Sequence, residues 1–359
     1  MFQPPTIAGI ASAFPSQTVD RMLAFETLVG MFPGEDPRFI TSLLERSGVG
    51  LRHIGPELES LLRESDFSAR NAHWKTHALE LSARAIHLAL ERARLSPAEI
   101  DCVIDVSCTG IAIPALDVDL VSRASLRSDV RRIPITESGC AAGGLALGLG
   151  ASLARGGERV LVLAVEVCSL TLPGGERTRT DLVAAALFAD GAAAAIVQPA
   201  NADQDSRAEH RPRILAGGSF LLPDTQRTMG FDIGDHGLRI VLDRDLPEVL
   251  SAAFPDALDA FLARHGKRRA DIGLHLMHPG GRRVLEVWES AFELPAGGLV
   301  YSRQSLERFG NLSSASILTV IELALADGAR VNPGQVALAA AVGPGLSLEF
   351  LLLEWPSRA

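Results

Sequence analysis

The chain has 359 residues, of which 47% are hydrophobic and only 21% are charged. A sequence of this length and composition can bury a large core or two packed halves, so global disorder is excluded. The net charge of −9 and the aromatic content of 5% argue against a nucleic-acid-binding protein, because that function needs a basic surface or rings that stack on bases.

The four cysteines, Cys102, Cys108, Cys140 and Cys168, form no CxxC pair. A chain of this size does not need disulfides for stability. The N-terminal segment lacks a basic start followed by a long apolar run, and later apolar stretches are interrupted by Gly or by charged residues. We therefore expect a cytoplasmic protein without a membrane span and without a metal site.

The first half of the chain alternates between helix and strand patterns. Apolar residues at helical spacing predict an amphipathic helix from His77 to the Ser96-Pro97 stop, followed by a buried strand in the segment 101–110. A Gly-rich turn at 137–144 then opens a helix of small residues from about Ala141. Apolar strands are predicted at 159–167 and 191–199, so the fold class is α/β. The segment from Met22 to about Ser68 is helix and loop material of mixed polarity.

The second half resembles the first, which predicts a divergent internal duplication. The segment 261–280 parallels 90–110, and about 40 residues later each half has a Gly turn that opens a helix of small residues. A polar segment at 200–213 without periodicity separates the halves, which we place at 1–200 and 211–359. The duplication predicts that Cys140 and Asn311 lie at equivalent helix N-termini, which can face one cavity.

Three residues are candidates for the chemistry of such a cavity. The start of a helix favours negative charge, so it should lower the pKa of Cys140 and activate the thiol. His278 leads into Pro-Gly-Gly, a turn that exposes the ring, whereas His275 lies on the opposite face of the predicted strand. Each residue also has a structural interpretation, because a free cysteine is usually a small core residue and Asn311 could cap the helix near Leu312.

Taken together, these motifs resemble the type III polyketide synthases, the chalcone and stilbene synthase family of the thiolase superfamily. The family's cysteine, histidine and asparagine motifs correspond to GCAAGG at Cys140, HPGG at His278 and GNLSSA at Asn311. The segments ALFADGAAAAIV around Phe188, GPGLSLE near the C-terminus and SCTGIAIPALD from Ser107 also match. The resemblance spans roughly 101–349.

The resemblance implies a thiolase-like fold of duplicated αβαβα layers and catalysis by Cys140, His278 and Asn311. It implies that a starter acyl-CoA and malonyl-CoA are the substrates, that no cofactor is needed, and that the protein is a homodimer that binds neither nucleic acid nor membrane. Positions expected to bind substrate are Phe188, Ile240, Thr171, Ser313, Gly280, Gly281 and Arg46.

Two departures from the family pattern bear on the substrate. Ile240 stands where the family often has a second aromatic gate, which should widen the cavity and favour an aliphatic starter with an alkylpyrone or alkylresorcinol product. The family's lysine-rich coenzyme A patch is weak, and the candidate substitutes are Arg46, Arg52, Arg282 and Arg283.

Other functions remain open from the sequence. The ketoacyl-carrier-protein synthases III use a similar triad, but they typically follow the histidine with Gln-Ala-Asn rather than with Pro279-Gly280-Gly281. A cysteine acyltransferase or hydrolase would share Cys140 and His278 but would not consume malonyl-CoA. A catalytically silent homologue would have no need of all three polar residues.

Overall fold

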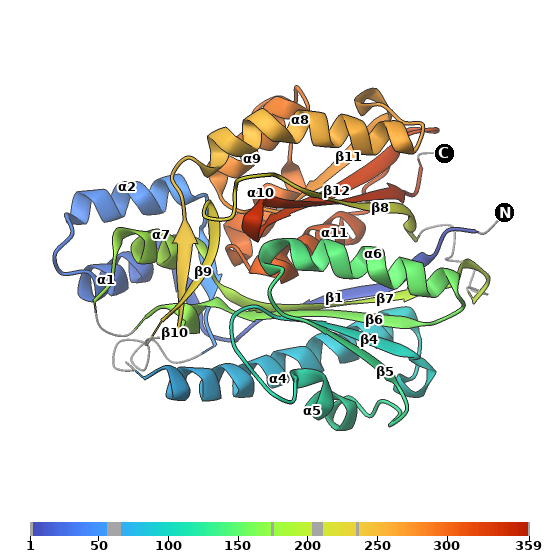
Figure 1. The fold of residues 1–359 in the computed structure, drawn as a ribbon, viewed down its shortest axis with the longest axis horizontal. Helices are drawn as coiled ribbons and strands as arrows, with labels where there is room; N and C mark the ends of the chain where they lie inside the picture. The colour runs from blue at the N-terminus through green and yellow to red at the C-terminus, as the bar shows by residue number, and fades with distance from the viewer. Residues whose placement is uncertain (1–2, 56–65, 174–175, 203–210, 235–236, 358–359) are drawn as a thin grey trace.

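A mixed sheet of nine strands runs through the molecule in the order β11-β12-β13-β8-β1-β7-β6-β4-β5 (Figure 1). The computed structural model describes residues 3–55, 66–173, 176–202, 211–234 and 237–357. The first-half strands are β1 Thr6–Ala13, β4 Cys102–Val106, β5 Arg131–Ile135, β6 Val160–Val167 and β7 Asp190–Gln198. The second-half strands are β8 Arg213–Leu221, β11 Ile272–Met277, β12 Val336–Gly343 and β13 Ser347–Glu354.

The strand pairing repeats between the two parts of this sheet. In the first part β4 pairs parallel with β6, and β6 then β7 then β1 pair antiparallel. In the second part β11 pairs parallel with β12, and β12 then β13 then β8 pair antiparallel. A single residue pair, Thr6 with Arg213, joins β1 to β8. The predicted duplication is therefore present in the strand order and direction.

Helices cover both outer faces and fill the space between the two parts of the sheet. In Figure 1, α4 and α5 lie below the first part, α8 and α9 lie above the second part, and α6 and α11 lie between them. The larger helices are α4 Phe67–Ala93, α5 Leu116–Arg123, α6 Ala142–Arg155, α8 Leu246–Arg264, α9 Arg282–Ala291, α10 Val300–Phe309 and α11 Ser316–Ala326. The layered αβαβα arrangement expected from the sequence is thus confirmed.

A smaller group of elements packs beside the layers, at the left of Figure 1. It comprises α1 Arg21–Met31, α2 Pro37–Ser47, α7 Arg179–Leu187, β2 Thr18–Asp20, β3 Leu51–His53, β9 Met229–Gly234 and β10 Gly237–Leu242. Apolar side chains of α1, α2 and α7 form a core cluster of their own. For the segment from Met22 to about Ser68, the sequence pattern predicts only helix and loop material, and the structure adds the strand β3 there.

The predicted boundaries differ from the observed ones at several ends. The helix expected from His77 begins at Phe67, where Asp66 caps it by accepting a hydrogen bond from the backbone N–H of Ser68 (2.9 Å). The strands expected at 159–167 and 191–199 are observed one residue away, as β6 and β7. The boundary between the predicted halves 1–200 and 211–359 falls largely on residues outside the described ranges, so this division stays a prediction.

The fold brings two similar turns together at the centre of the molecule. A 3-10 turn, η2 (Gly139–Ala141), precedes α6, and a second one, η7 (Ser313–Ala315), precedes α11. The two turns contact each other, and the 3-10 turn η8 (Pro344–Leu346), which links β12 to β13, contacts η2. Four of the predicted site residues lie in or next to these turns or at the adjacent end of β11.

Candidate active site

Cys140 is the middle residue of η2, two residues before α6 begins. The turn needs glycine before the cysteine, because Gly139 has a φ of +52° and a Cβ there would lie 2.5 Å from Cδ of Pro344. The Gly343-Pro344-Gly345 segment therefore does more than connect two strands, because it packs directly against the turn that carries the thiol.

The Cys140 thiol is buried against the second turn. Its Sγ lies 3.4 Å from Oγ of Ser313, and burial raises the pKa of Cys140 to about 12, although the Ser313 hydroxyl opposes that shift. The expectation that the helix start lowers this pKa is therefore wrong for the unliganded site, because the cost of burying a thiolate exceeds the favourable field of the turn. The thiol is protonated at rest and must lose its proton to react.

His278 follows the last residue of β11 and is 1% exposed. Its backbone N–H donates to the carbonyl of Ala340 in β12 (2.8 Å), which fixes the residue at the sheet end. Burial lowers the pKa of His278 to about 4, so the ring is neutral. Its Nδ1 has no hydrogen-bond partner within the described part of the chain, which leaves the imidazole able to bind a ligand atom or a proton.

His275 has the structural role that the sequence indicated for it. Its ring packs edge-on against Phe292, with the ring centroids 4.4 Å apart. It therefore belongs to the packing between β11 and the end of α9. His278, by contrast, leads directly into Gly280, the carbonyl of which accepts from Asn311.

Asn311 lies just before η7 and is 2% exposed. Its side-chain oxygen accepts a hydrogen bond from the backbone N–H of Ser313 (2.9 Å) in a local turn, but Asn311 is not the N-cap of α11, which is Ala315. Its Nδ2 donates to the carbonyl of Gly280 at 3.3 Å, a long bond that a better acceptor can replace. The backbone of Asn311 also pairs with Leu187 and Ala189, on either side of Phe188.

A chain of short contacts links the three predicted catalytic residues. His278 leads into Gly280, Gly280 accepts from Asn311, Asn311 accepts from Ser313, and Ser313 contacts Cys140. Asn311 and Cys140, from separate segments, are thus linked through Ser313, and His278 is joined to Asn311 through the backbone of Gly280. Such a set can supply a nucleophile and two groups able to donate hydrogen bonds to a developing oxyanion.

A cavity of about 40 Å³ opens beside Cys140. Four of the predicted positions line it together with the thiol, namely Thr171, Phe188, Ile240 and Ser313. Gly280 and Gly281 do not line it, but Gly280 accepts from Asn311, and a Cβ added to Gly281 would lie 3.3 Å from Leu187. The walls are mostly apolar, which suits a hydrocarbon or polyketide chain.

Phe231 is a wall residue that the sequence interpretation missed. It lies directly across from Ile240 in the antiparallel pair of β9 and β10, and both side chains line the cavity. The smaller side chain at position 240 therefore stands beside a ring supplied by the neighbouring strand. Only the strand register reveals this, because the two residues are nine positions apart in sequence.

A buried carboxylate and two further thiols complete the site and were also missed. Glu166 at the end of β6 accepts hydrogen bonds from the backbone N–H of Cys108 (3.1 Å), from the Thr109 hydroxyl (2.8 Å) and from Ser314. Burial raises the pKa of Glu166, and these donors oppose the shift. Cys108 and Cys168 line the cavity with Cys140.

The arginines considered for coenzyme A occupy different environments. Arg46 is exposed in the last turn of α2. Arg282 pairs with Glu286 and Arg283 pairs with Glu248 on the surface. Arg52 is buried, so it cannot bind a phosphate in solvent. Of the four, only Arg46 combines exposure with no ion pair at hand among the described salt bridges.

The remaining sequence expectations concern metals and membranes. Among the described residues there is no cluster of three or more His, Cys, Asp or Glu side chains arranged to hold a metal ion. In the same part of the chain, no helix has the length and apolar character needed to cross a bilayer.

Comparison with protein families finds two matches that together cover most of the chain. Residues 52–201 match the N-terminal domain of chalcone and stilbene synthases, and residues 214–355 match the C-terminal domain. The chain is 38% identical to the 1,3,6,8-tetrahydroxynaphthalene synthase of Streptomyces peucetius subsp. caesius over 356 residues, which covers 98% of this chain and 93% of the relative.

Two further relatives agree with this match. The 1,3,6,8-tetrahydroxynaphthalene synthase of Streptomyces coelicolor is 32% identical over 315 residues, or 87% of this chain and 82% of the relative. The crystal structure of a 1,3,6,8-tetrahydroxynaphthalene synthase from Streptomyces coelicolor A3(2), described as a bacterial type III polyketide synthase, superposes with a TM-score of 0.90. That alignment has 28% identity and covers 99% of this chain and 100% of the other. The chain therefore belongs to the chalcone and stilbene synthase family and is a type III polyketide synthase, an acyltransferase with a thiolase-like fold.

Proposed function

We propose that Cys140 accepts the acyl group of a starter acyl-CoA and extends it by decarboxylative condensation with malonyl-CoA, and that the chain then cyclises to a pyrone or a phenolic, resorcinol-type product. Members of this family use an acyl-CoA starter and malonyl-CoA. The observation that carries the proposal is the contact chain from His278 through Gly280, Asn311 and Ser313 to Cys140.

Acylation requires the protonated Cys140 thiol to become a thiolate. We assign that proton to His278, the ring of which is neutral and has an unpaired Nδ1 among the described residues. The thiolate adds to the thioester carbonyl of the starter, the C–S bond to coenzyme A breaks, and the departing sulfur takes a proton back. The acyl group remains on Cys140 as a new thioester.

Condensation requires an enolate, and we assign its stabilisation to His278 and Asn311. The thioester oxygen of malonyl-CoA would accept hydrogen bonds from the imidazole and from Nδ2 of Asn311, in place of the 3.3 Å bond to Gly280. Loss of carbon dioxide leaves the electron pair on the α-carbon, which attacks the Cys140 thioester and releases the Cys140 sulfur. Each oxyanion donor of this kind typically contributes about 2.7–4 kcal/mol.

Three features bear on the product, on the starter and on coenzyme A. The relatives' names describe synthesis of a polyhydroxylated naphthalene, which favours a phenolic product over a pyrone for this chain. The small cavity beside Cys140, with Phe231 facing Ile240, favours a short starter over a long alkyl chain. The exposed guanidinium of Arg46 is the group we assign to a phosphate of coenzyme A.

Radiolabelled malonyl-CoA with purified protein tests the proposal. The wild-type enzyme should release labelled carbon dioxide and form an extended product, and the Cys140→Ala variant should form no extended product. Cys102→Ala is the matched control, because Cys102 is a buried thiol in β4 outside the cavity. Equal product from wild type and Cys140→Ala would contradict the proposal. Release of free acid without consumption of malonyl-CoA would support the hydrolase alternative.

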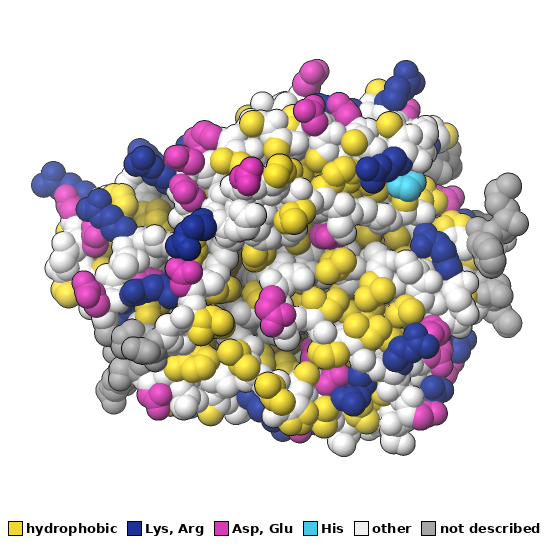
Figure 2. All heavy atoms as spheres, viewed as in Figure 1, with side chains coloured by type: hydrophobic (Ala, Val, Ile, Leu, Met, Phe, Trp, Pro, Cys, Tyr) yellow, Lys and Arg dark blue, Asp and Glu magenta, His cyan; other side chains and the backbone are white. Residues whose placement is uncertain are grey.

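We further propose that two copies associate through the face that carries β5. This strand is an unpaired edge of the sheet, and the nearby segment exposes Ile111, Ile113 and Val118, with Ile113 96% exposed. Figure 2 shows hydrophobic side chains gathered over the lower part of this face, where α4, α5 and β5 lie in Figure 1. Exposed apolar patches of this kind mark protein contacts. Light scattering should find a dimer, and a monomer at micromolar concentration would contradict this.

A further inference from the structure

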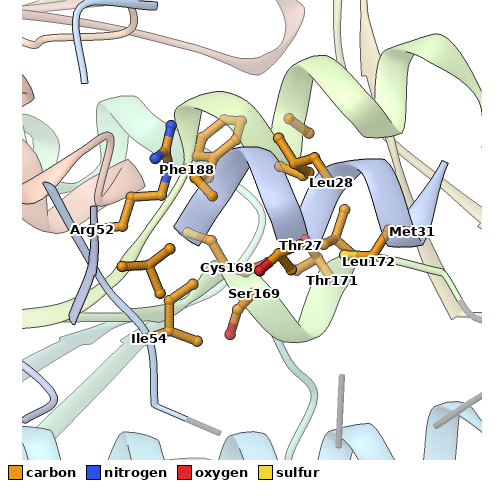
Figure 3. Close-up of a pocket in the computed structure, with 14 residues that line it drawn as sticks. Thr27, Leu28, Met31, Arg52, Ile54, Cys168, Ser169, Thr171, Leu172 and Phe188 are labelled. Carbon is orange, nitrogen blue, oxygen red and sulfur yellow. The ribbon is translucent and has the colours of Figure 1, made fainter. Parts of the chain in front are cut away.

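A second cavity, of about 50 Å³, lies next to the one at Cys140 and has no role in the proposed chemistry (Figure 3). It is enclosed by α1, β2, β3, α7 and the 3-10 turn η3 (Cys168–Thr171). Most of its wall is apolar and includes Leu28, Met31, Ile54 and Leu172. A wall of this composition is suited to a carbon chain rather than to a polar nucleotide.

The two cavities share three wall residues, Cys168, Thr171 and Phe188. These side chains form a partition with the Cys140 thiol on one side and α1 on the other. A chain attached to Cys140 that passes this partition therefore enters the second cavity. The space there corresponds to about three to five water-sized groups, at roughly 10–15 Å³ each, so it fits the end of a chain rather than a whole substrate.

Among the described residues, Arg52 is the one charged side chain in the wall of the second cavity. It is 2% exposed, and it donates from one terminal nitrogen to the carbonyl of Ala186 near the end of α7. Its Nε and its other terminal nitrogen have no partner within the described ranges. In Figure 3 the guanidinium lies on the Phe188 side of the cavity. The side chain is thus a buried cation with hydrogen-bond donors left over.

Such an arrangement is unfavourable unless something accepts from these donors. Leaving a buried donor unpaired is costly, and the cost is larger when the group is charged. Burial and the like charge of Arg21 lower the pKa of Arg52 to about 10, so the group is still a cation at neutral pH. A ligand oxygen at this point would satisfy the free N–H groups, and a methyl group would not.

We propose that the second cavity holds the far end of the acyl chain carried by Cys140, and that Arg52 selects chains whose end bears an oxygen, as a carboxylate or a ketone. This inference rests on the proposed function and names the class of chain that the site accepts. Phe188 lines both cavities beside the guanidinium, so the chain passes this ring on its way to Arg52. A carboxylate would come from a dicarboxylic starter, and a ketone from a growing polyketide.

Three starters of equal chain length test the inference. Glutaryl-CoA ends in a carboxylate, 4-oxopentanoyl-CoA carries a ketone near its end, and pentanoyl-CoA ends in a methyl group. With malonyl-CoA as extender, the wild-type enzyme should show a higher kcat/KM for the first two than for the third. In Arg52→Met this preference should fall by about tenfold or more, while kcat/KM for pentanoyl-CoA stays within about threefold.

Arg155→Met is the matched control. Arg155 also donates to backbone carbonyls, those of Ile214 and Leu215, but it lies outside both cavities. Its loss should leave the starter preference unchanged. Arg52→Lys keeps the charge but not the planar fork, and it should give an intermediate preference.

The outcomes distinguish a carboxylate from other chain-end oxygens, and they distinguish failure of this inference from failure of the proposed function. A change for glutaryl-CoA alone assigns the site to a carboxylate, and a change for both oxygenated starters assigns it to any chain-end oxygen. A wild-type enzyme that prefers pentanoyl-CoA, or an equal loss for all three starters in Arg52→Met, overturns the inference and leaves Arg52 as a support for α7. No extended product from the wild-type enzyme with any starter contradicts the proposed function itself.

Discussion

The turns η2 and η7 occupy equivalent places in the two halves of the fold, yet they carry different chemistry. Gly139 and Ser313 each begin a turn and share a left-handed backbone, with φ of +52° and +49°. The next residues are Cys140 and Ser314. The Cys140 thiol faces the cavity, whereas the Ser314 hydroxyl donates to the buried Glu166. The duplication thus gives two turns of similar backbone, but the side chain on one lines the cavity and the side chain on the other binds a buried carboxylate.

The comparison also explains why a serine occupies a strained position. A non-glycine residue with this φ is uncommon and costs free energy, so it persists where something else depends on it. The Ser313 hydroxyl lies within 3.4 Å of the Cys140 sulfur and 3.5 Å of the Cys108 sulfur. Glycine stands at position 139 because Pro344 leaves no room for a side chain. The two turns have the same backbone conformation, but packing against Pro344 determines the residue at position 139 and contacts within the site determine the residue at position 313.

Exchanging the residues of the two turns should have the largest effect. The double variant Cys140→Ser with Ser314→Cys retains one thiol in an equivalent turn, but that thiol faces Glu166 and not the cavity. We expect condensation to fall by more than about a thousandfold, as for removal of a nucleophile. Product formation from labelled malonyl-CoA measures it, and substantial activity would show that the two turns are interchangeable.

Removing one of the two proposed oxyanion donors, Asn311 or His278, should have the next largest effect. We expect Asn311→Ala and His278→Ala each to lower kcat by about 100-fold to 1,000-fold, since one such donor is typically worth about 2.7–4 kcal/mol. His275→Gln is the control, because His275 packs against Phe292 and should retain activity. Carbon dioxide release measures the malonyl step separately, and an unchanged rate in Asn311→Ala would remove that residue from it.

Opposite substitutions at Gly139 and Ser313 should change stability in opposite directions. Gly139→Ala places a methyl group at positive φ against Pro344, so the free energy of unfolding should fall by about 1–3 kcal/mol. Ser313→Gly relieves backbone strain and should raise it slightly, at the expense of activity. Ser313→Ala separates the two effects, because it keeps the strain and removes the hydroxyl. Urea unfolding measures the effect on stability, and kcat measures the effect on activity. An equal change in the free energy of unfolding for Gly139→Ala and Ser313→Gly would contradict this comparison of the two turns.

A smaller, pH-dependent effect is expected at Glu349 in β13. Burial raises the pKa of Glu349 to about 7, and the Ser219 hydroxyl opposes the shift (2.7 Å). Because the folded pKa is raised, its contribution to stability is complete below the unfolded value near 4.5 and is lost as pH rises through about 7. Between pH 6 and 7 the wild-type protein should lose about 1 kcal/mol that Glu349→Gln does not lose.

The control for this effect is Glu354→Gln, at the exposed end of the same strand. That substitution should leave the pH dependence of unfolding unchanged. If wild type and Glu349→Gln show parallel stability curves between pH 6 and 8, the carboxyl is ionised throughout that range and is better solvated than its burial indicates.

The sequence by itself determined the layered α/β class, the duplication and the identity of Cys140, His278 and Asn311 as candidate site residues. These follow from local signals, because the periodicity of hydrophobic residues and the glycines of turns can be recognised within short stretches of sequence. The sequence duplication predicted that Cys140 and Asn311 are equivalent positions, and this was wrong. The residue equivalent to Cys140 is Ser314, and Asn311 lies three residues earlier. The pKa of Cys140 was predicted with the wrong sign, because the extent of burial depends on segments far away in sequence.

Only the tertiary structure decided which residues share a cavity. Phe231 meets Ile240 through strand register, Glu166 reaches Ser314 across the two halves, and Arg52 becomes a buried cation because α1 and α7 close around β3. None of these pairs is close in sequence or has a distinctive motif. Burial and distance are properties of the packed chain, so side chains whose roles depend on them become visible only when the layers are assembled.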